Sequence, residues 1–449
     1  MNGKERIRKT LSFEPVDRTP WVPYAGVQAA NLIGLDAETY LKNADNIVSG
    51  ILKAYELYKP DGLPVVFDIQ IEAEALGCKL KWAKNNPPSV ATHILEEKPL
   101  SELKLPTEND GRYPIVLETA RKLVAAIGDK IALYALICGP FTLALHLRGT
   151  EIFTEMIEEP ELVEELLQFC TEVAKSFASM YAQTGIAVIA VVDPMTSQIS
   201  PRHFKRFVKP YATELNQHVK ALGLKVTTFC CGDATKNIEL MCQTETDGIA
   251  FDENVDLAYA KEIATNYKVS FGGNLPLTTV MLFGSPLENV KEARREIETG
   301  QGVGYILSSG CDIPFDTPVK NLMAISDYVN GDFSSLEMLE SSQELQSEDE
   351  PEMEDVEIKS GHVFIEIVTL DSEGCPPCQY MCEAVRKIQS RYESKLTWRE
   401  SLVKTRAGIK RMGELGVKNL PAMLINNKVV FDNIIPSEKE LIGEIESRL

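Results

Sequence analysis

The sequence has little positive charge for its length. Lys and Arg number 46 in 449 residues against 66 Asp and Glu, which gives a formal net charge of −20. Nucleic acids and anionic membrane surfaces are bound through clustered basic side chains. This composition therefore argues against nucleic acid and against membranes as partners.

Long apolar runs are also missing. The longest uncharged apolar stretch, 131–147, has 17 residues and is interrupted by Gly139, Pro140 and His146, whereas a membrane-spanning helix needs about 20 clean residues. The charged start, residues 1–8, leads into no apolar segment of the kind found in secretory signals. We expect a cytoplasmic protein whose ten cysteines are reduced thiols, available for metal binding or redox chemistry.

The acidic side chains are distributed unevenly along the chain. Residues 332–359 contain eleven acidic side chains and one basic side chain, a balance of −10. A segment of this composition has too little apolar surface to form a core. The sequence therefore predicts a domain at 1–330, an acidic flexible linker at 331–360 and a second domain at 361–449.

Apolar runs typical of buried strands recur through the first domain, separated by amphipathic helical patterns such as 160–181 and 286–299. They lie at 19–25, 63–68, 131–138, 186–193, 224–231, 248–252, 268–273 and 304–309. The runs are continuously apolar rather than alternating, as in parallel strands that are covered on both faces. Eight such units predict an α/β fold, a (β/α)8 TIM barrel.

Polar and thiol side chains follow these predicted strands. Active sites of such barrels lie at the carboxyl ends of the strands, so we expect the following residues to share one rim: Asp68, Cys138, Asp193, Cys231, Asp252, Asn274 and Cys311.

The second domain reads as a strand at 363–370, a helix to about 394, another helix near 401–415 and a hairpin at 422–431. Cys375-Pro376-Pro377-Cys378 opens the first helix, where the helix dipole favours the thiolate of Cys375. Alternatively, this CxxC motif could form half of a zinc site, although neither a second CxxC nor a suitably spaced His pair lies nearby. Cys382 could be a third thiol or a core residue.

Together these features resemble the thioredoxin and glutaredoxin superfamily. The resemblance implies a thioredoxin-like domain with a redox-active Cys375–Cys378 disulfide and a thiol-disulfide redox partner. Pro421 matches the cis-proline that faces the dithiol in that superfamily. Gly374 replaces the usual Trp, which favours a dedicated role over a general one.

A second resemblance covers nearly the whole barrel. It is carried by the segments Pro15-Val16-Asp17-Arg18-Thr19-Pro20, Val66-Phe67-Asp68-Ile69, Glu72-Ala73-Glu74-Ala75-Leu76-Gly77-Cys78, Gly139-Pro140-Phe141-Thr142-Leu143, Asp193-Pro194, Gly272-Gly273-Asn274 and Ile306-Leu307-Ser308-Ser309-Gly310-Cys311. These segments are similar to the uroporphyrinogen decarboxylase superfamily, in its branch of corrinoid-dependent methyltransferases. The resemblance implies methyl transfer, in one-carbon metabolism, between a methylcobamide on a small corrinoid protein and an acceptor in the barrel.

That branch also implies a zinc ion as cofactor, with Cys231 and Cys311 matching two of its ligands. Phe229 stands where the family has a histidine ligand. The third zinc ligand could therefore be Cys230, Glu74 or Asp252.

The catalytic candidates are Asp68, which matches the aspartate beside the pyrroles in the decarboxylases, His146, which stands where they have a tyrosine, and Asp193 and Asp252. Residues 21–42 contain no arginine to hold the substrate's carboxylates, so uroporphyrinogen decarboxylation is disfavoured. The alternative to methyl transfer is a redox-coupled tetrapyrrole- or corrinoid-binding protein with a degenerate barrel site.

Overall fold

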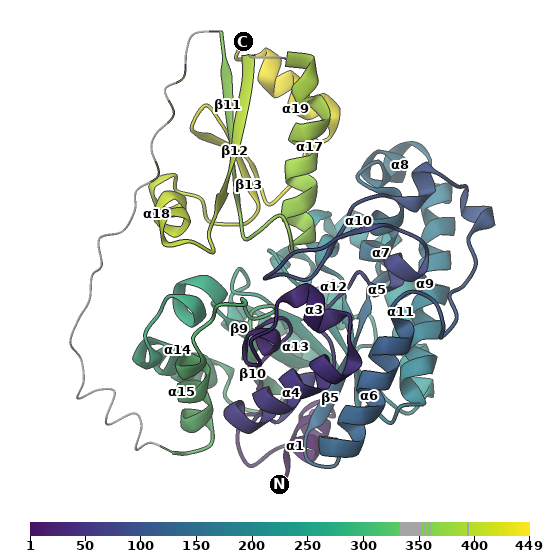
Figure 1. Ribbon diagram of the computed structural model, residues 1–449, viewed down its shortest axis with the longest axis vertical. Helices are drawn as coiled ribbons and strands as arrows, with labels where there is room; N and C mark the ends of the chain where they lie inside the picture. The colour runs from purple at the N-terminus through teal and green to yellow at the C-terminus, as the bar shows by residue number, and fades with distance from the viewer. Residues whose placement is uncertain (333–352, 354–355, 357, 359–360, 393–394) are drawn as a thin grey trace. The chain divides into compact units, whose positions relative to one another are not determined.

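The computed structural model describes residues 1–332, 353, 356, 358, 361–392 and 395–449. The chain forms two compact units, a barrel and a smaller C-terminal unit that runs from green to yellow in Figure 1. Nearly all of the predicted acidic linker, 331–360, lies outside the described residues.

The barrel is built on eight parallel strands in the order β1-β10-β9-β8-β7-β6-β5-β2. They are β1 (Trp21–Val22), β2 (Gly62–Pro64), β5 (Ala132–Cys138), β6 (Val188–Val192), β7 (Lys225–Cys230), β8 (Gly248–Phe251), β9 (Ser270–Leu275) and β10 (Tyr305–Ser309). Each lies within or across a predicted run, so the predicted (β/α)8 fold is confirmed. In the register of the sheet, Val192 is the partner of both Cys138 and Phe229, so β5, β6 and β7 end at one level.

Helices surround the sheet and return the chain to the amino ends of the strands (Figure 1). They are α1 (Gly3–Thr10), α2 (Gln28–Asn31), α3 (Ala37–Leu41), α4 (Ala44–Tyr58), α5 (Ile71–Ala75), α6 (Tyr113–Ile127), α7 (Pro140–Arg148), α8 (Ile152–Glu158), α9 (Pro160–Ala182), α10 (Pro201–Phe207), α11 (Lys209–Ala221), α12 (Ile238–Cys242), α13 (Leu257–Tyr267), α14 (Pro286–Gly300) and α15 (Val319–Val329). The strands β3 (Leu80–Lys81) and β4 (Ser89–Val90) form a separate antiparallel pair. The start of α14 shows how local sequence sets these bounds, because Ser285 and Glu288 form a capping box and Pro286 follows the cap.

The barrel closes between β1 and β2, the two ends of the hydrogen-bonded ladder. The Asp61 N–H donates to the carbonyl of Trp21 (2.8 Å), and the Trp21 N–H donates to the Asp61 carboxylate (2.8 Å). Asp61 also pairs with Arg18 Nη1 (2.6 Å) and with Arg6, whose guanidinium pairs in turn with Asp17 (2.6 Å). We call this contact between β1 and β2 the seam.

The C-terminal unit is a four-stranded sheet in the order β12-β11-β13-β14. Its strands are β11 (Val363–Thr369), β12 (Leu396–Leu402), β13 (Ala422–Ile425) and β14 (Lys428–Asp432), and only the β11–β12 pair is parallel. The helices α17 (Pro376–Tyr392) and α19 (Glu438–Glu446) cover one face and α18 (Arg406–Glu414) the other (Figure 1). Each face carries its own apolar cluster.

The helix predicted at 401–415 is wrong at its start, because β12 occupies residues 396–402 and α18 begins only at Arg406. Polar side chains of β12 and α18 contact a buried carboxylate on the neighbouring strand β11. Glu366 on β11 pairs with Arg399 (3.0 Å) and with Arg411 (3.0 Å), and it accepts a hydrogen bond from Ser401 Oγ (2.6 Å). Burial alone would raise the pKa of Glu366, but these partners outweigh it and lower that pKa.

Within the described ranges, no helix has both the length and the apolar character needed to cross a bilayer.

Candidate functional site

Seven polar or thiol side chains come from the carboxyl ends of the barrel strands or from the loops directly after them. Asp68 follows β2, Cys138 ends β5, Asp193 follows β6, Cys231 follows β7, Asp252 follows β8, Asn274 lies in β9 and Cys311 follows β10. Because all eight strands are parallel, these positions lie at one end of the barrel, which we call the mouth.

Asp68 and Glu74 share one buried arginine. Arg112 Nη1 lies 2.7 Å from Asp68, and Arg112 Nε donates to Glu74 (2.6 Å). The guanidinium also lies 4.8 Å from the ring centroid of Trp82. Glu74 is therefore held by a cation and is poorly placed to serve as a metal ligand. Arg112 immediately precedes α6, far from Asp68 in sequence, and no motif signals it.

Glu72 is a further carboxyl group of this region, and it was not among the candidate site residues predicted from the sequence. Its side chain is 1% exposed and accepts a hydrogen bond from the N–H of Cys138 (2.8 Å). Burial raises the pKa of Glu72 to about 8, and the nearby Asp68 adds to the effect. Glu72 is therefore mainly a neutral acid at pH 7.

Asp193 connects β6 to the start of α7. Its carboxylate accepts hydrogen bonds from the Thr142 N–H (2.8 Å), the Thr142 hydroxyl (2.6 Å) and the Phe141 N–H (3.4 Å). A Cβ on Gly139 would lie 2.3 Å from this carboxylate, so the glycine permits the close approach. Burial raises the pKa of Asp193 to about 6, opposed by the hydrogen bonds from Thr142. This geometry suits a positioning role.

His146 lies in the protein interior. It is 2% exposed, its Nδ1 is 4.0 Å from the Sγ of Cys138, and its carbonyl oxygen is 2.9 Å from the Nδ1 of His93. Burial lowers the pKa of His146 to about 3, so its imidazole is neutral at physiological pH. The function proposed below does not use this side chain.

Cys231 and Cys311 come together although they follow different strands, and both are partly exposed. Burial raises the pKa of Cys231 well above its usual range, and a side-chain hydrogen bond with Cys311 raises it further. Burial also raises the pKa of Tyr24 to about 12, against a hydrogen bond with Ser308 and with a contribution from both thiols. Cys231 and Cys311 thus form a thiol pair beside Tyr24, and burial favours the protonated form of Cys231.

Phe229 packs in an aromatic cluster with Tyr24 and Phe67. The ring centroid of Phe229 is 5.5 Å from that of Tyr24 and 6.3 Å from that of Phe67, and Tyr24 and Phe67 are 5.8 Å apart. Phe229 is 3% exposed. Where the family resemblance implies an imidazole, this chain has a buried apolar ring.

The candidates for a third zinc ligand are engaged elsewhere. Cys230 Sγ lies 3.3 Å from the Thr196 hydroxyl, Glu74 is held by Arg112, and Asp252 accepts hydrogen bonds from Gly232 and Asn254. In the part of the chain that the structure describes, no group of three or more His, Cys, Asp or Glu side chains is arranged to hold a metal ion. Catalytic zinc takes three protein ligands, so these residues do not fit a zinc ion.

Asp252 and Glu253 form a carboxyl pair at the end of β8. Asp252 accepts hydrogen bonds from both the N–H and the side-chain amide of Asn254 (3.0 Å each), and the amide of Asn274 donates to the Asp252 carbonyl (3.1 Å). Burial raises the pKa of Asp252 to about 6 and that of Glu253 to about 8, the latter with a contribution from Asp252. Burial thus favours the protonated form of both carboxyl groups, and hydrogen bonds from Gly232 and Asn254 oppose it at Asp252. A Cβ on Gly310 would lie 2.4 Å from Glu253, which keeps that position small.

The dithiol of the C-terminal unit lies at the start of α17. Cys375 is partly exposed, whereas Cys378 and Cys382 are buried. Cys382 belongs to the apolar cluster between the sheet and the helices α17 and α19, which supports a packing role. The Leu420–Pro421 peptide bond is cis and directly precedes β13.

The sequence of the barrel matches a known protein family. Residues 2–331 match the model of the family described as uroporphyrinogen decarboxylase (URO-D). The chain belongs to the URO-D family. This match ends before the C-terminal unit, so it does not assign that unit to a family.

Members of the URO-D family that resemble this chain include methyltransferases and decarboxylases. The methylcobamide:CoM methyltransferase MtbA of Methanosarcina acetivorans is 29% identical over 326 residues, which cover 71% of this chain and 95% of that protein. MtaA of Methanosarcina barkeri, also named a methylcobamide:CoM methyltransferase, is 26% identical over 333 residues, 72% and 96% of the two chains. The uroporphyrinogen decarboxylase of Trichodesmium erythraeum is 27% identical over 291 residues, 63% and 80% of the two chains.

A solved structure supports the fold of this URO-D family member. A methyltransferase from Methanosarcina mazei superposes with a TM-score of 0.68 at 24% identity, covering 74% of this chain and 100% of that one. The prediction of a methyltransferase of the URO-D superfamily is confirmed by the family match and by the methyltransferase relatives.

Proposed function

We propose that the barrel is a corrinoid-dependent methyltransferase. In this proposal it moves a methyl group between a methylcobamide, carried by a separate small corrinoid protein, and an acceptor bound in the mouth. The observation that carries the proposal is the similarity of nearly the whole barrel to two proteins named methylcobamide:CoM methyltransferases.

Within this proposal Cys231 and Cys311 line the acceptor site, and Asp252 takes up the acceptor's proton. The acceptor atom supplies the electron pair of the new bond to carbon, the cobalt–carbon bond breaks with its pair remaining on cobalt, and the proton passes to Asp252. Hydrogen bonds from Gly232 and Asn254 favour the carboxylate form of Asp252 against its burial, and a proton acceptor must be in that form. Asp193 and Asp68 act as positioning residues through Thr142 and Arg112.

The test is the loss of methylcobalamin on addition of coenzyme M, measured with the full chain under anaerobic conditions. Asp252→Asn should lower the rate by about a hundredfold, the lower range for loss of acid–base catalysis. Glu262→Gln, an exposed acid on the next helix, is the matched control and should leave the rate unchanged. Absence of turnover with coenzyme M and with a methylated corrinoid protein would contradict the proposal.

For the C-terminal unit we propose a thioredoxin-like disulfide exchange. The thiolate of Cys375 attacks a partner disulfide and forms a mixed disulfide, and Cys378 then attacks Cys375. The partner leaves with two thiols, and the unit retains a Cys375–Cys378 disulfide, so two electrons and two protons have passed to the partner. The partly exposed Cys375 beside the buried Cys378 supports these roles.

A second candidate function is a redox-coupled protein whose barrel binds a tetrapyrrole or corrinoid without methyl transfer. The aromatic cluster of Phe229, Tyr24 and Phe67 favours it, because the buried ring of Phe229 stands in place of the imidazole that would help a metal to activate a thiol. Saturable cobalamin binding without methylcobalamin turnover would select this candidate. Decarboxylation of uroporphyrinogen stays disfavoured, because residues 21–42 lack arginine.

A further inference from the structure

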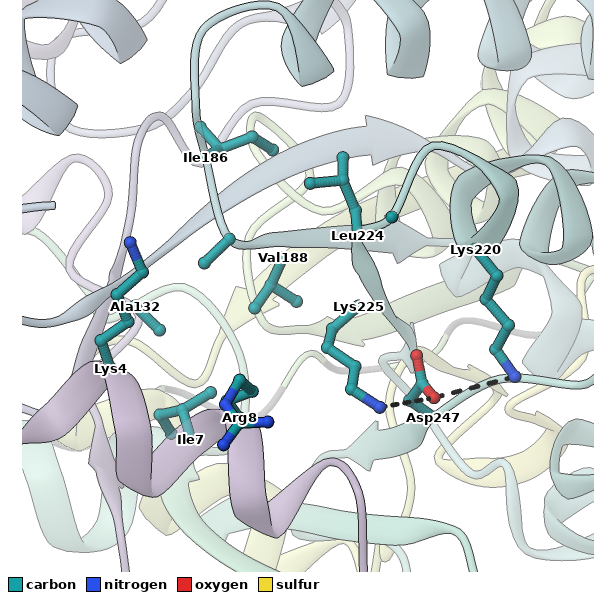
Figure 2. Close-up of a pocket in the computed structure, with 12 residues that line it drawn as sticks. Lys4, Ile7, Arg8, Ala132, Ile186, Val188, Lys220, Leu224, Lys225 and Asp247 are labelled. Carbon is teal, nitrogen blue, oxygen red and sulfur yellow. Dashed lines mark hydrogen bonds and ion pairs between the residues drawn. The ribbon is translucent and has the colours of Figure 1, made fainter. Parts of the chain in front are cut away.

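A cavity of about 500 Å³ lies at the end of the barrel opposite the mouth. Its walls include Ala132, Val188 and Lys225, which belong to the starts of β5, β6 and β7. Helix α1 forms another wall, and α11 with the loop after it a third (Figure 2). The volume is in the usual range for small-molecule sites.

Basic side chains from three elements converge on this cavity. Lys4 and Arg8 come from α1, Lys220 from α11 and Lys225 from β7, while Asp247 is the one carboxylate among the lining residues. Four positive charges against one negative charge stand out in a chain whose net charge is −20. Charges of one sign on a concave wall focus the field and attract counter-ions.

The single carboxylate is largely used by the fold. One oxygen of Asp247 accepts a hydrogen bond from the N–H of Val226 (2.9 Å), and the other is shared by Lys225 (3.2 Å) and Lys220 (3.7 Å), as the dashed lines in Figure 2 mark. Lys4 donates to the carbonyl of Gly128 (2.7 Å), which is not an anion. The positive charge of the cavity is therefore only partly neutralised.

Arg8 is an exposed cation at this cavity. Among the described residues its guanidinium has neither a hydrogen bond nor an ion pair. Lys4, Ile7 and Arg8 share one face of α1 by their spacing, so Arg8 is directed to the cavity that Ile7 and Lys4 line. A guanidinium presents a planar set of donors that matches phosphate oxygens.

The cavity also has an apolar wall. Leu224 and Ala187 are the partly exposed apolar residues of this wall, and Ile7, Ile186 and Val188 are buried behind it. Apolar surface next to a field of three excess positive charges suits a molecule with an uncharged part and a polyanionic part better than a single inorganic ion.

We propose that this cavity binds a small molecule that carries two or more phosphate groups. The phosphates contact Arg8, Lys220 and Lys225, and the remainder of the ligand packs on the apolar wall. This site is separate from the mouth and does not depend on the methyl-transfer proposal.

Isothermal titration calorimetry of the full chain with pyrophosphate and with ADP tests the proposal. Both should bind, with ADP tighter because it also uses the apolar wall, and added salt should weaken both. Arg8→Gln and Lys220→Gln should each weaken binding by about tenfold, and Asp247→Asn should tighten it, because a competing negative charge is lost.

Lys9→Gln is the matched control, since it removes the same charge from the same helix at a position that does not line the cavity. It should change the affinity less than twofold. Absence of binding of both probes would overturn the proposal, as would equal weakening by Lys9→Gln and Arg8→Gln. ADP binding no tighter than pyrophosphate would overturn the role of the apolar wall. Arg8 has no side-chain partner to lose, so its variant should fold, and thermal unfolding of each variant checks this.

Discussion

At the residue scale, the position of Phe229 separates this chain from the zinc-binding pattern that its sequence resembles. Phe229 lies near the end of β7 and Cys231 follows the strand two residues later, a spacing that places alternate residues of an extended chain on one side. We expect any zinc in the wild type to be substoichiometric after dialysis, because its residues do not fit the ion, and Phe229→His to raise the zinc content, since it supplies an imidazole beside Cys231. Metal analysis of both proteins is the measurement. Phe229→Leu, which adds no donor, should not raise the content, and equal zinc in all three proteins would contradict the expectation.

Glu72 gives the barrel a pH-dependent stability. Its pKa rises from 4.5 to about 8 on folding, so between those values the folded state holds a proton that the unfolded state has lost. Its contribution is fully present below pH 4.5 and is lost as the pH rises through 8, with a slope of at most about 1.4 kcal/mol per pH unit. Glu72→Gln should flatten the fall in stability between pH 5 and pH 8.

Urea unfolding at several pH values measures this slope. Glu38→Gln, which replaces an exposed acid on α3, should retain the wild-type slope. An unchanged slope in Glu72→Gln would show that Glu72 is ionised in the folded protein.

Exposure separates Cys375 from Cys378, and a raised thiol pKa separates it from Cys231. Cys375 is partly exposed, Cys378 is buried, and the pKa of Cys231 is raised by burial. Because alkylation requires an accessible thiolate, brief treatment of the reduced protein at mildly acidic pH should label Cys375 before Cys378 and Cys231. Peptide mass spectrometry reads the order, and labelling at equal rates would count against Cys375 as the attacking thiol.

At the scale of elements, the seam differs from the other strand pairs of the barrel. Those pairs are joined by a ladder of backbone hydrogen bonds, whereas the seam depends largely on side chains. Asp61 is 2% exposed and pairs with two arginines. Removing one partner of a buried ion pair costs about 3–5 kcal/mol, so Asp61→Asn should lower the free energy of unfolding of the barrel by an amount in this range. Asp17→Asn, at a carboxylate that is 45% exposed, should cost about 1 kcal/mol or less. Chemical denaturation compares the two, and equal effects would refute the role of Asp61.

The eight barrel strands were predictable because parallel strands buried on both faces leave continuous apolar runs. The strand β12 was not, since its Arg399 and Ser401 are polar and pack on a buried Glu366 that only the fold brings near. In the mouth, the residues after each strand were predicted, whereas Arg112, Glu72 and Glu253 were missed. Their roles arise from burial and from partners distant in sequence, which a local pattern does not reveal.

At the scale of the whole molecule, the chain consists of two units with separate cores. The C-terminal unit has an apolar cluster on each face of its sheet, and a domain with its own core can fold alone. We therefore expect 1–332 and 361–449, expressed separately, to fold and to melt as they do in the full chain. Circular dichroism melts of the three proteins provide the measurement. A 361–449 fragment without a cooperative transition would contradict the predicted domain boundaries.

The seam also determines the order in which backbone amides of the barrel should exchange with deuterium. Strands β7 and β8 lie at the middle of the hydrogen-bonded ladder, with three strands on either side of the pair, so deuterium exchange of their amides requires broad unfolding. Amides beside β1 and β2 are held partly by one carboxylate, and a local opening there leaves the rest of the ladder intact. Exchange should therefore start at residues 21–22 and 61–64 and advance around the sheet from both ends, leaving the strands farthest from the seam protected longest.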